Sequence, residues 1–246
     1  MQTFYFTDPG KVRSHNEDSV TIINNENKEF VLAIADGMGG HKAGEVASSI
    51  AIEHVINSFY NLKTMGSKEN AIEWLRQIVK EINDQIFDYA DKNPESKGLG
   101  TTLVIAIKTE DYILYGNIGD SSGYVIKNGI LHKVTKDHTY VGMLVNSGKI
   151  SEESAKNHPG KNLLTRALGA NNPIEIDIFD IDTSVRGLFL CSDGLTNMVN
   201  VEQIEKTLNS NLSIEEAVVK LIKKANSRGG TDNISIAYLK KESGEL

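Results

Sequence analysis

Short apolar segments separated by only a few polar residues constrain the fold of this chain most. Residues 102–107 and 112–118 are rich in β-branched side chains and flank one polar turn, and residues 123–126 and 130–134 flank another. The second turn contains an Asn-Gly pair, which favours a tight hairpin because both residues tolerate positive φ. Strands joined by turns this short run antiparallel. Further strands are predicted at residues 2–6, 18–23, 30–35, 174–178, 187–191 and 234–239.

The predicted helices cluster in two pairs instead of alternating with the strands. One helix begins near Glu45, and a longer one spans residues 69–91, where apolar residues three or four positions apart form a single stripe. Two more helices follow residue 191, and Ser213 and Glu216 form a capping box at the start of the second. Clustered helices and antiparallel strands predict an α+β fold and not a doubly wound one.

Composition narrows the class of protein. The 246 residues contain no linker-like or low-complexity run, which indicates a single domain. A net charge of −7 argues against a nucleic-acid partner, and the single cysteine, Cys191, excludes a disulfide framework and a cysteine-rich zinc site. No apolar run is long enough to span a membrane and no signal-like segment is present, so we expect a cytoplasmic protein.

Aspartates recur where the predicted strands begin or end. Asp36, Asp120 and Asp193 each follow an apolar strand, Asp232 precedes the last one, and Asp18 begins another. A single aspartate at such a position is usually a turn residue. The repetition beside glycines indicates instead that these carboxylates converge at one edge of the core, where they repel each other unless a cation is present. Oxygen-only donors suit Mg²⁺ or Mn²⁺.

Other phosphate chemistries fail at particular residues. The glycine-rich stretch after Asp36 has the spacing of a Walker loop, but Glu45 stands where that loop needs lysine. Cys191 lacks the arginine that a cysteine-based phosphatase places six residues later. Residues 180–184 approach the pattern of aspartyl-nucleophile phosphatases, but Ser184 breaks it, and we expect this segment to lie on the surface.

An ordered set of motifs then resembles one family, the bacterial metal-dependent protein phosphatases of the 2C type. Each motif is weak alone, but together they cover the chain from about residue 7 to residue 239. The motifs are Arg-Ser-His-Asn-Glu-Asp at 13–18, Asp-Gly-Met-Gly-Gly-His-Lys-Ala-Gly-Glu at 36–45, Gly-Thr-Thr at 100–102, Gly-Asp-Ser at 119–121, Asp-His at 137–138, Thr-Arg-Ala-Leu-Gly at 165–169, Ser-Asp-Gly at 192–194 and Gly-Thr-Asp-Asn-Ile at 230–234.

The resemblance implies a fold and a cofactor. It implies a four-layer αββα sandwich, with two packed antiparallel β-sheets flanked by helices. It also implies a single phosphatase domain over residues 1–246, with a flap subdomain at about residues 139–165 that gates the substrate. Two tightly bound Mn²⁺ or Mg²⁺ ions are expected in a cleft at one end of the sandwich, together with a third, weaker ion site.

The resemblance also implies roles for particular residues. Asp36 bridges the two metals, the Gly37 carbonyl binds one of them, and Asp193 and Asp232 hold the other. Asp120, together with Asp193, matches the weaker third site.

Further residues are expected around the metals. Glu17 and Asp18 act mostly through metal-bound waters, and Asn233 supports the site beside them. Arg13 is the expected catalytic residue that grips the substrate phosphate, because its guanidinium can fork onto two phosphate oxygens.

The general acid is left open by the resemblance. Animal relatives place a histidine where this chain has Met38, and His41 is the candidate replacement. Solvent or a water on the third metal is the alternative. A second departure is Ser122, where family members often carry arginine after Gly-Asp-Ser.

The implied reaction is hydrolysis of phosphoserine and phosphothreonine on proteins. A hydroxide that bridges the two metals attacks phosphorus directly, without a phosphoenzyme. The expected partners are phosphorylated proteins and a cognate cytoplasmic serine/threonine kinase, with no nucleic acid and no membrane, and the protein is expected to be a monomer. The alternatives are a regulatory switch phosphatase acting on anti-anti-sigma-type phosphoproteins, and a phosphoprotein-binding module with little turnover.

Overall fold

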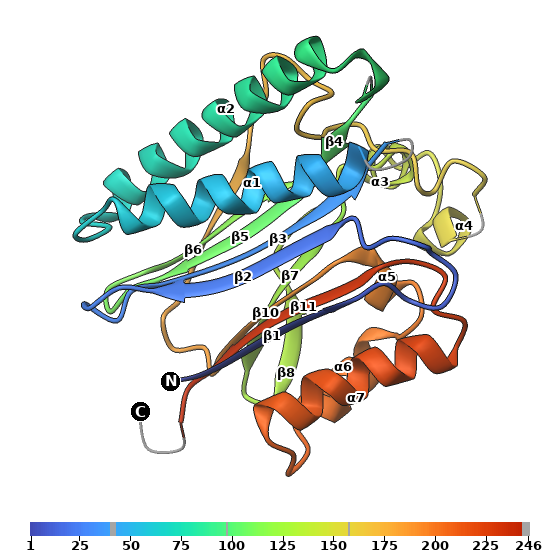
Figure 1. The fold of residues 1–246 in the computed structure, drawn as a ribbon. Coiled ribbons are helices and arrows are strands. Elements are labelled where there is room, and N and C mark those ends of the chain that lie inside the picture. The colour runs from blue at the N-terminus through green and yellow to red at the C-terminus, as the bar shows by residue number, and fades with distance from the viewer. Residues whose placement is uncertain (40–42, 97, 157, 243–246) are drawn as a thin grey trace.

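The computed structural model describes residues 1–39, 43–96, 98–156 and 158–242. Two antiparallel sheets pack face to face, and helices cover the outer side of each sheet (Figure 1). The predicted α+β sandwich with four αββα layers is therefore confirmed.

The first sheet has five strands in the order β1-β11-β10-β7-β8, and every pair in it is antiparallel. The two ends of the chain meet in this sheet, because Gln2 pairs with Lys240 and the pairing continues to Asp8 and Ile234. The strands are β1 (Gln2–Asp8), β7 (Ser122–Lys127), β8 (Ile130–Lys133), β10 (Gly187–Cys191) and β11 (Ile234–Lys240).

The second sheet is also antiparallel, with the order β2-β3-β5-β6-β9 and a short strand, β4, paired to the end of β3. Its strands are β2 (Asp18–Asn24), β3 (Phe30–Met38), β4 (Gly100–Thr101), β5 (Leu103–Lys108), β6 (Ile113–Ile118) and β9 (Asp177–Ile181).

A hydrophobic layer holds the two sheets together. Alternate residues of β3 and β5, such as Leu32 and Val104, meet residues of β10 and β11, such as Leu190 and Ala237, and all four are fully buried. Each apolar side chain removed from water in this way stabilises the fold by about 1.5–3 kcal/mol before the entropy of ordering is subtracted. This layer fixes which strand ends lie next to each other.

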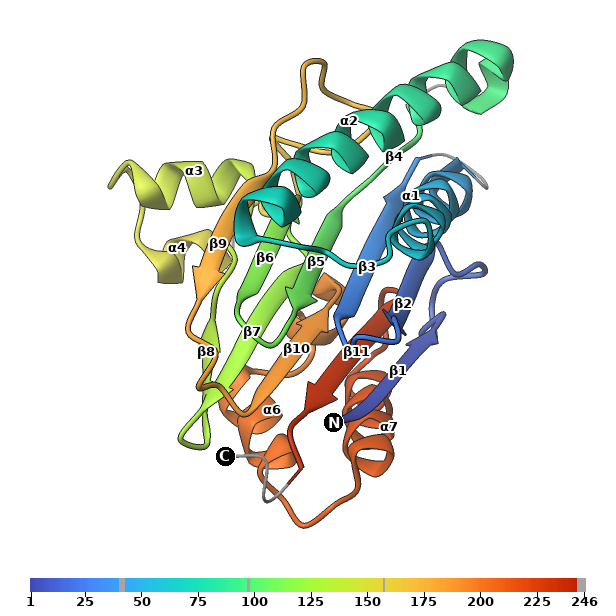
Figure 2. The same cartoon turned by 90° about the vertical axis from the view of Figure 1, so that its left-hand side faces the viewer.

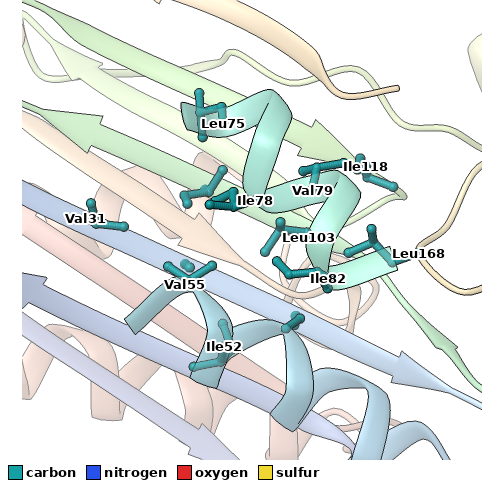
Figure 3. Packing of buried hydrophobic residues seen from close by; sticks show 14 of the residues in the cluster. Val31, Ile52, Val55, Leu75, Ile78, Val79, Ile82, Leu103, Ile118 and Leu168 are labelled. Atoms are coloured by element: carbon teal, nitrogen blue, oxygen red, sulfur yellow. The ribbon is translucent and has the colours of Figure 1, made fainter. Parts of the chain in front are cut away.

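Two long helices cover the second sheet. They are α1 (Ala43–Tyr60) and α2 (Lys68–Lys92). Figure 3 shows Ile78, Val79 and Ile82 of α2 packed towards Leu103 and Ile118 of the sheet. The predicted apolar stripe on α2 is confirmed, and the Ser67 side chain caps its first turn.

Three helices cover the first sheet: α5 (Asp193–Thr196), α6 (Val201–Leu208) and α7 (Ile214–Ser227). The predicted capping box is present at α7, where Ser213 and Glu216 each accept the other's backbone N–H. Within the described residues, the helices are too short or too polar to cross a membrane.

Residues 139–156 and 158–165 stand beside the sandwich, at the end where α5 lies (Figures 1 and 2). The segment carries α3 (Tyr140–Asn146) and α4 (Glu152–Lys156), and an isolated bridge between Thr139 and Leu164 closes its base. The sequence predicts a short helix after Ser151, which α4 confirms, and it predicts no helix at α3. The α3 helix is stabilised by the Thr139 side chain, which accepts a hydrogen bond from the Gly142 N–H.

Two strands differ from the sequence prediction. β3 continues to Met38, three residues beyond the predicted end, because Gly37 and Met38 pair with β4. β9 spans Asp177–Ile181 and not residues 174–178, because Ile174 and Ile176 pack against the α2 side of the core before the strand joins β6. A short 3₁₀ helix, η1 (Pro94–Ser96), follows α2.

The α2 stripe provides a stability test. Ile82 is fully buried, so Ile82→Ala should lower the free energy of unfolding by about 2–5 kcal/mol through lost burial and a new cavity. Lys80→Ala on the exposed face should change it by no more than about 0.5 kcal/mol. Urea unfolding followed by circular dichroism measures both. Similar losses in the two variants would contradict the packing described here.

Candidate active site

A cleft of about 490 Å³ opens where the strand ends of both sheets meet. Asp36 from β3, Asp120 after β6, Asp193 after β10 and Asp232 before β11 all line it, together with Arg13. The structure therefore brings four of the five strand-end aspartates to one opening. Glu17 and Gly37 also line it.

The fifth aspartate, Asp18, lies directly behind the cleft. It pairs with Asp36 across β2 and β3, and only 6% of it is exposed. One of its carboxylate oxygens accepts a hydrogen bond from the Ser192 hydroxyl at 2.8 Å. The other oxygen is buried and has no hydrogen-bond partner.

The chain around Asp36 is held tightly by its neighbours. The Asp36 N–H donates to the Thr102 hydroxyl at 3.0 Å, and the Thr102 N–H donates to the Asp36 carbonyl at 2.9 Å. Gly37 donates to the Glu17 carbonyl at 3.0 Å. A Cβ atom at Gly37 would lie 2.1 Å from the Gly44 carbonyl oxygen, so only glycine fits here. This close packing directs the Asp36 side chain into the cleft.

Asn233 ties the N-terminal loop to the start of β11. Its amide oxygen accepts from the Glu17 N–H at 2.8 Å, and its amide nitrogen donates to the carbonyls of Pro9 and His15. Its own N–H donates to Asp232 at 3.0 Å. Asn233 therefore positions both Glu17 and Asp232.

Burial and mutual repulsion raise the pKa of most of these carboxyl groups. Burial and the charge of Asp18 raise the pKa of Asp36 well above its usual value. Burial and Asp193 raise the pKa of Asp120 to about 7, while burial and Asp232 raise that of Asp193 to about 6. Burial also raises the pKa of Asp18 to about 7. The negative charges of these carboxylates are therefore poorly balanced when no cation is bound.

Arg13 brings a positive charge next to the cleft aspartates. Its guanidinium forks onto Asp232, with Nε and Nη2 each 3.0 Å from a carboxylate oxygen. This pairing raises the pKa of Arg13, and its side chain is half exposed. Arg13 can therefore reach a ligand at the mouth of the cleft.

The donor set fits hard divalent cations. In the described part of the chain, no three acidic, histidine or cysteine side chains converge closely enough to form a finished metal-ligand cluster. The carboxylates instead surround an open space, which suits ions that keep several of their own waters. The unpartnered buried oxygens of Asp18 and Glu17 are acceptors that a bound ion or its waters would satisfy.

Other expected residues lie outside this cluster. His41 falls outside the described residues, whereas Met38 lines the cleft. Residues 180–184, which approach the aspartyl-nucleophile pattern, lie on the surface as predicted. Asp180 pairs with Lys68 there, and Asp182 pairs with Lys127.

Several side-chain contacts around the cleft could not be predicted from the sequence. Asn197 donates to Asp193 at 3.0 Å, and Thr102 links the Asp36 strand to Ser121, hydroxyl to hydroxyl, at 2.8 Å. The first contact spans four residues and the second spans 19. Residues 162–167 also line the cleft, Arg166 among them. Thr102, Ser121 and Arg166 lie in the family motifs, but the motifs do not show which residues these side chains contact.

An αββα sandwich with an acidic cleft at the ends of both sheets defines a class of protein, the metal-dependent phosphoester hydrolases. Comparisons with known proteins agree with this class. A family profile described as protein phosphatase 2C matches residues 11–227. The serine/threonine phosphatase stp of Listeria monocytogenes is 40% identical over 243 residues, which cover 98% of this chain and 96% of the relative.

Solved structures give the same result. The serine/threonine phosphatase of S. agalactiae superposes with a TM-score of 0.93 at 31% identity, covering 98% of this chain and 99% of that one. Serine/threonine phosphatase Stp1 from Staphylococcus aureus gives a TM-score of 0.91 at 35% identity, covering 98% and 95%.

The chain belongs to the protein phosphatase 2C family. This family is metal-dependent in general, with Mn²⁺ or Mg²⁺, and the expected enzyme class, a protein serine/threonine phosphatase, is confirmed.

The raised pKa values predict how the stability of the metal-free protein depends on pH. A carboxyl group with a raised folded-state pKa contributes stability that is present below the unfolded pKa and is lost as the pH rises through the folded one. For Asp18 and Asp120 this window runs from 3.8 to about 7. In chelator, the Tm should therefore fall by about 3 °C or more between pH 5.5 and pH 7.5.

Scanning fluorimetry measures this effect. Asp18→Asn, which removes one of the raised groups, should reduce the fall, and saturating Mn²⁺ should flatten it. A Tm that rises over the same pH range would show that the carboxylates are not destabilising in the metal-free protein.

Proposed function

We propose that the acidic cleft hydrolyses phosphoserine and phosphothreonine esters on proteins. The observation that carries this proposal is the convergence of four aspartates from both sheets on one opening that also contains Arg13. The confirmed family membership supports the reaction class, and the roles of the individual residues below are our own assignments.

We assign the metal ligands by position in the cleft. Asp36, the Gly37 carbonyl, Asp193 and Asp232 would hold two ions, Mn²⁺ or Mg²⁺, and Asp120 would hold a third, weaker one. Ions bound there supply Lewis-acid chemistry, which activates water and stabilises the charge that develops on the phosphoryl group. The aspartates contribute negative charge and fixed positions, because the hydrogen bonds around Asp36 and Asp193 leave them little freedom.

Glu17, Asp18 and Asn233 support this set from behind. Asn233 fixes the loop that carries Glu17, and Asp18 faces Asp36 across two strands. The oxygens of Glu17 and Asp18 without a hydrogen-bond partner would accept hydrogen bonds from waters of a bound ion.

Arg13 would bind the phosphate of the substrate. The fork that holds both oxygens of Asp232 matches two oxygens of a phosphate monoester equally well. Arg13 would exchange one anion for the other when the substrate enters, and its positive charge would stabilise the departing oxygen. His41 remains the candidate proton donor to that oxygen, with solvent as the alternative.

The setting of the reaction is also part of the proposal. We infer a single domain with residues 139–165 as a flap beside the cleft. The reason is that residues 162–165, at the end of this segment, and the following Arg166 line the opening. We further infer a monomer in the cytoplasm that reverses a cognate serine/threonine kinase.

Hydrolysis of a phosphothreonine peptide tests the reaction. The wild type with Mn²⁺ should turn the peptide over, and chelator should abolish turnover. Asp193→Asn should lower kcat/KM by at least about 100-fold at limiting Mn²⁺, because it removes a charged ligand. Asp180→Asn, on the surface outside the cleft, is the matched control, and its kcat/KM should stay within about two-fold of the wild type. Equal rates in all samples would refute the mechanism.

Arg13→Ala separates phosphate binding from metal binding. It should lower kcat/KM for the peptide by about 100-fold through loss of a charge-assisted donor. Mn²⁺ affinity, measured by calorimetry, should be unchanged or tighter, because Asp232 loses its competing partner. Arg13→Lys retains the charge without the fork and should be intermediate in rate. A loss of Mn²⁺ affinity in Arg13→Ala would mean that Arg13 supports the metals instead.

A further inference from the structure

His138 lies between three segments that meet beside the cleft. It is 9% exposed and is not part of the cleft lining, so it cannot reach a substrate itself. Its imidazole Nδ1 is 3.1 Å from the Gly119 nitrogen, and its Nε2 is 3.1 Å from an oxygen of Asp177. Its carbonyl accepts from the Thr165 N–H at 2.8 Å.

These contacts assign the tautomer of His138. The Gly119 N–H can only donate, so Nδ1 must carry the lone pair and the proton must lie on Nε2. That proton is donated to Asp177. Burial raises the pKa of Asp177, but hydrogen bonds from Arg166 and His138 outweigh this effect and hold the pKa below its usual value. Asp177 is therefore a carboxylate acceptor at neutral pH.

His138 bonds to both backbone polar groups of Gly119, and the Asn117 amide also donates to the Gly119 carbonyl. The Gly119 N–H donates to the imidazole, and the Gly119 carbonyl accepts from the His138 N–H at 2.9 Å. Gly119 has a φ of +100°, and a Cβ atom there would lie 2.5 Å from the Thr102 side chain, so the turn has one conformation. Asp120 is the next residue, and its direction into the cleft depends on this peptide.

Arg166 links the same contacts to the cleft wall. Its Nη1 lies 2.6 Å from the second oxygen of Asp177, and Arg166 itself lines the cleft. The Asp177 carboxylate thus connects Arg166 to His138. His138 in turn contacts the Gly119 turn, which carries Asp120.

We propose that His138 is a positioning residue for the phosphatase reaction: its imidazole orients the Gly119 peptide, and thereby the Asp120 carboxylate, while Asp177 and Arg166 hold it in the required tautomer. The inference rests on the proposed function, because Asp120 matters only as a ligand of a cation in the cleft. It adds to that function a residue that acts through another and never touches the substrate.

Two substitutions of His138 separate its two hydrogen bonds. In His138→Asn, the amide oxygen can replace Nδ1 as the acceptor for Gly119 but cannot reach Asp177. In His138→Gln, the longer amide can reach Asp177 but places no acceptor at the Nδ1 position. Calorimetric titration with Mn²⁺ of each full-length variant should show the weakest binding step loosened about 10-fold in the Gln variant and within about 3-fold of the wild type in the Asn variant.

The second link is tested at Asp177. Asp177→Asn can donate to Nε2 and so favours the wrong tautomer, which sets two N–H groups against each other at Gly119. It should therefore loosen the same Mn²⁺ step in the wild-type background and have no effect in the His138→Asn background. In the metal-free protein, the ¹⁵N shifts of the His138 imidazole should show a protonated Nε2 and an unprotonated Nδ1, and Asp177→Asn should change this pattern.

The outcomes are distinguishable. Equal Mn²⁺ binding in the Asn and Gln variants at equal Tm, or a protonated Nδ1 in the wild type, would overturn the positioning role. Equal losses of Tm and Mn²⁺ affinity in both variants would overturn it too, since they would reduce His138 to a structural contact. Failure of the wild type to hydrolyse any phosphopeptide would count against the proposed function alone, because the Mn²⁺ and ¹⁵N readouts do not depend on turnover.

Discussion

The rest of the structure depends on holding several carboxylates together against their own repulsion. Asp18 and Asp36 come from one sheet, and Asp193 and Asp232 come from the other. Such a set is unfavourable in isolation, as the raised pKa values of Asp18 and Asp193 indicate. The apolar layer between the sheets supplies the stabilisation that offsets this cost. The core that stabilises the fold and the cleft that gathers the carboxylates therefore share the same strands.

The sequence predicts those elements that depend on residues close together in the chain. The stripe on α2 and the capping box at Ser213 are set by residues three or four positions apart, so each is visible in a short window. The start of β9 is not predicted in this way. Ile174 and Ile176 alternate with polar residues as in a strand, but they pack against the cluster that contains α2. Val141 is the one buried residue of the α3 helix, so the apolar periodicity of this segment is weak.

The same distinction applies to the cleft. The strand-end aspartates are recognisable because they repeat, and the ordered motifs assign them to a family. The contacts that orient them are not recognisable. Asn197 reaches Asp193 within one short helix, and His138 reaches Asp177 across 39 positions of the chain. Asn197 lies outside every motif, although its partner is only four residues away. The Asp-His motif marks His138 but does not reveal its partner, which comes close only when the segments meet.

The pairing of the first and last strands has a mechanical consequence. Gln2 and Lys240 are direct partners in antiparallel strands, so a force that pulls on both ends is directed across the ladder and loads its hydrogen bonds one at a time. Such loading unzips a ladder at low force, whereas shear would load every bond together. The opening would travel along β1 from Gln2 towards Asp8, and the last pair to separate, Asp8 with Ile234, lies two residues from Asp232. Under tension the edge of the first sheet would therefore peel away before the cleft is disturbed.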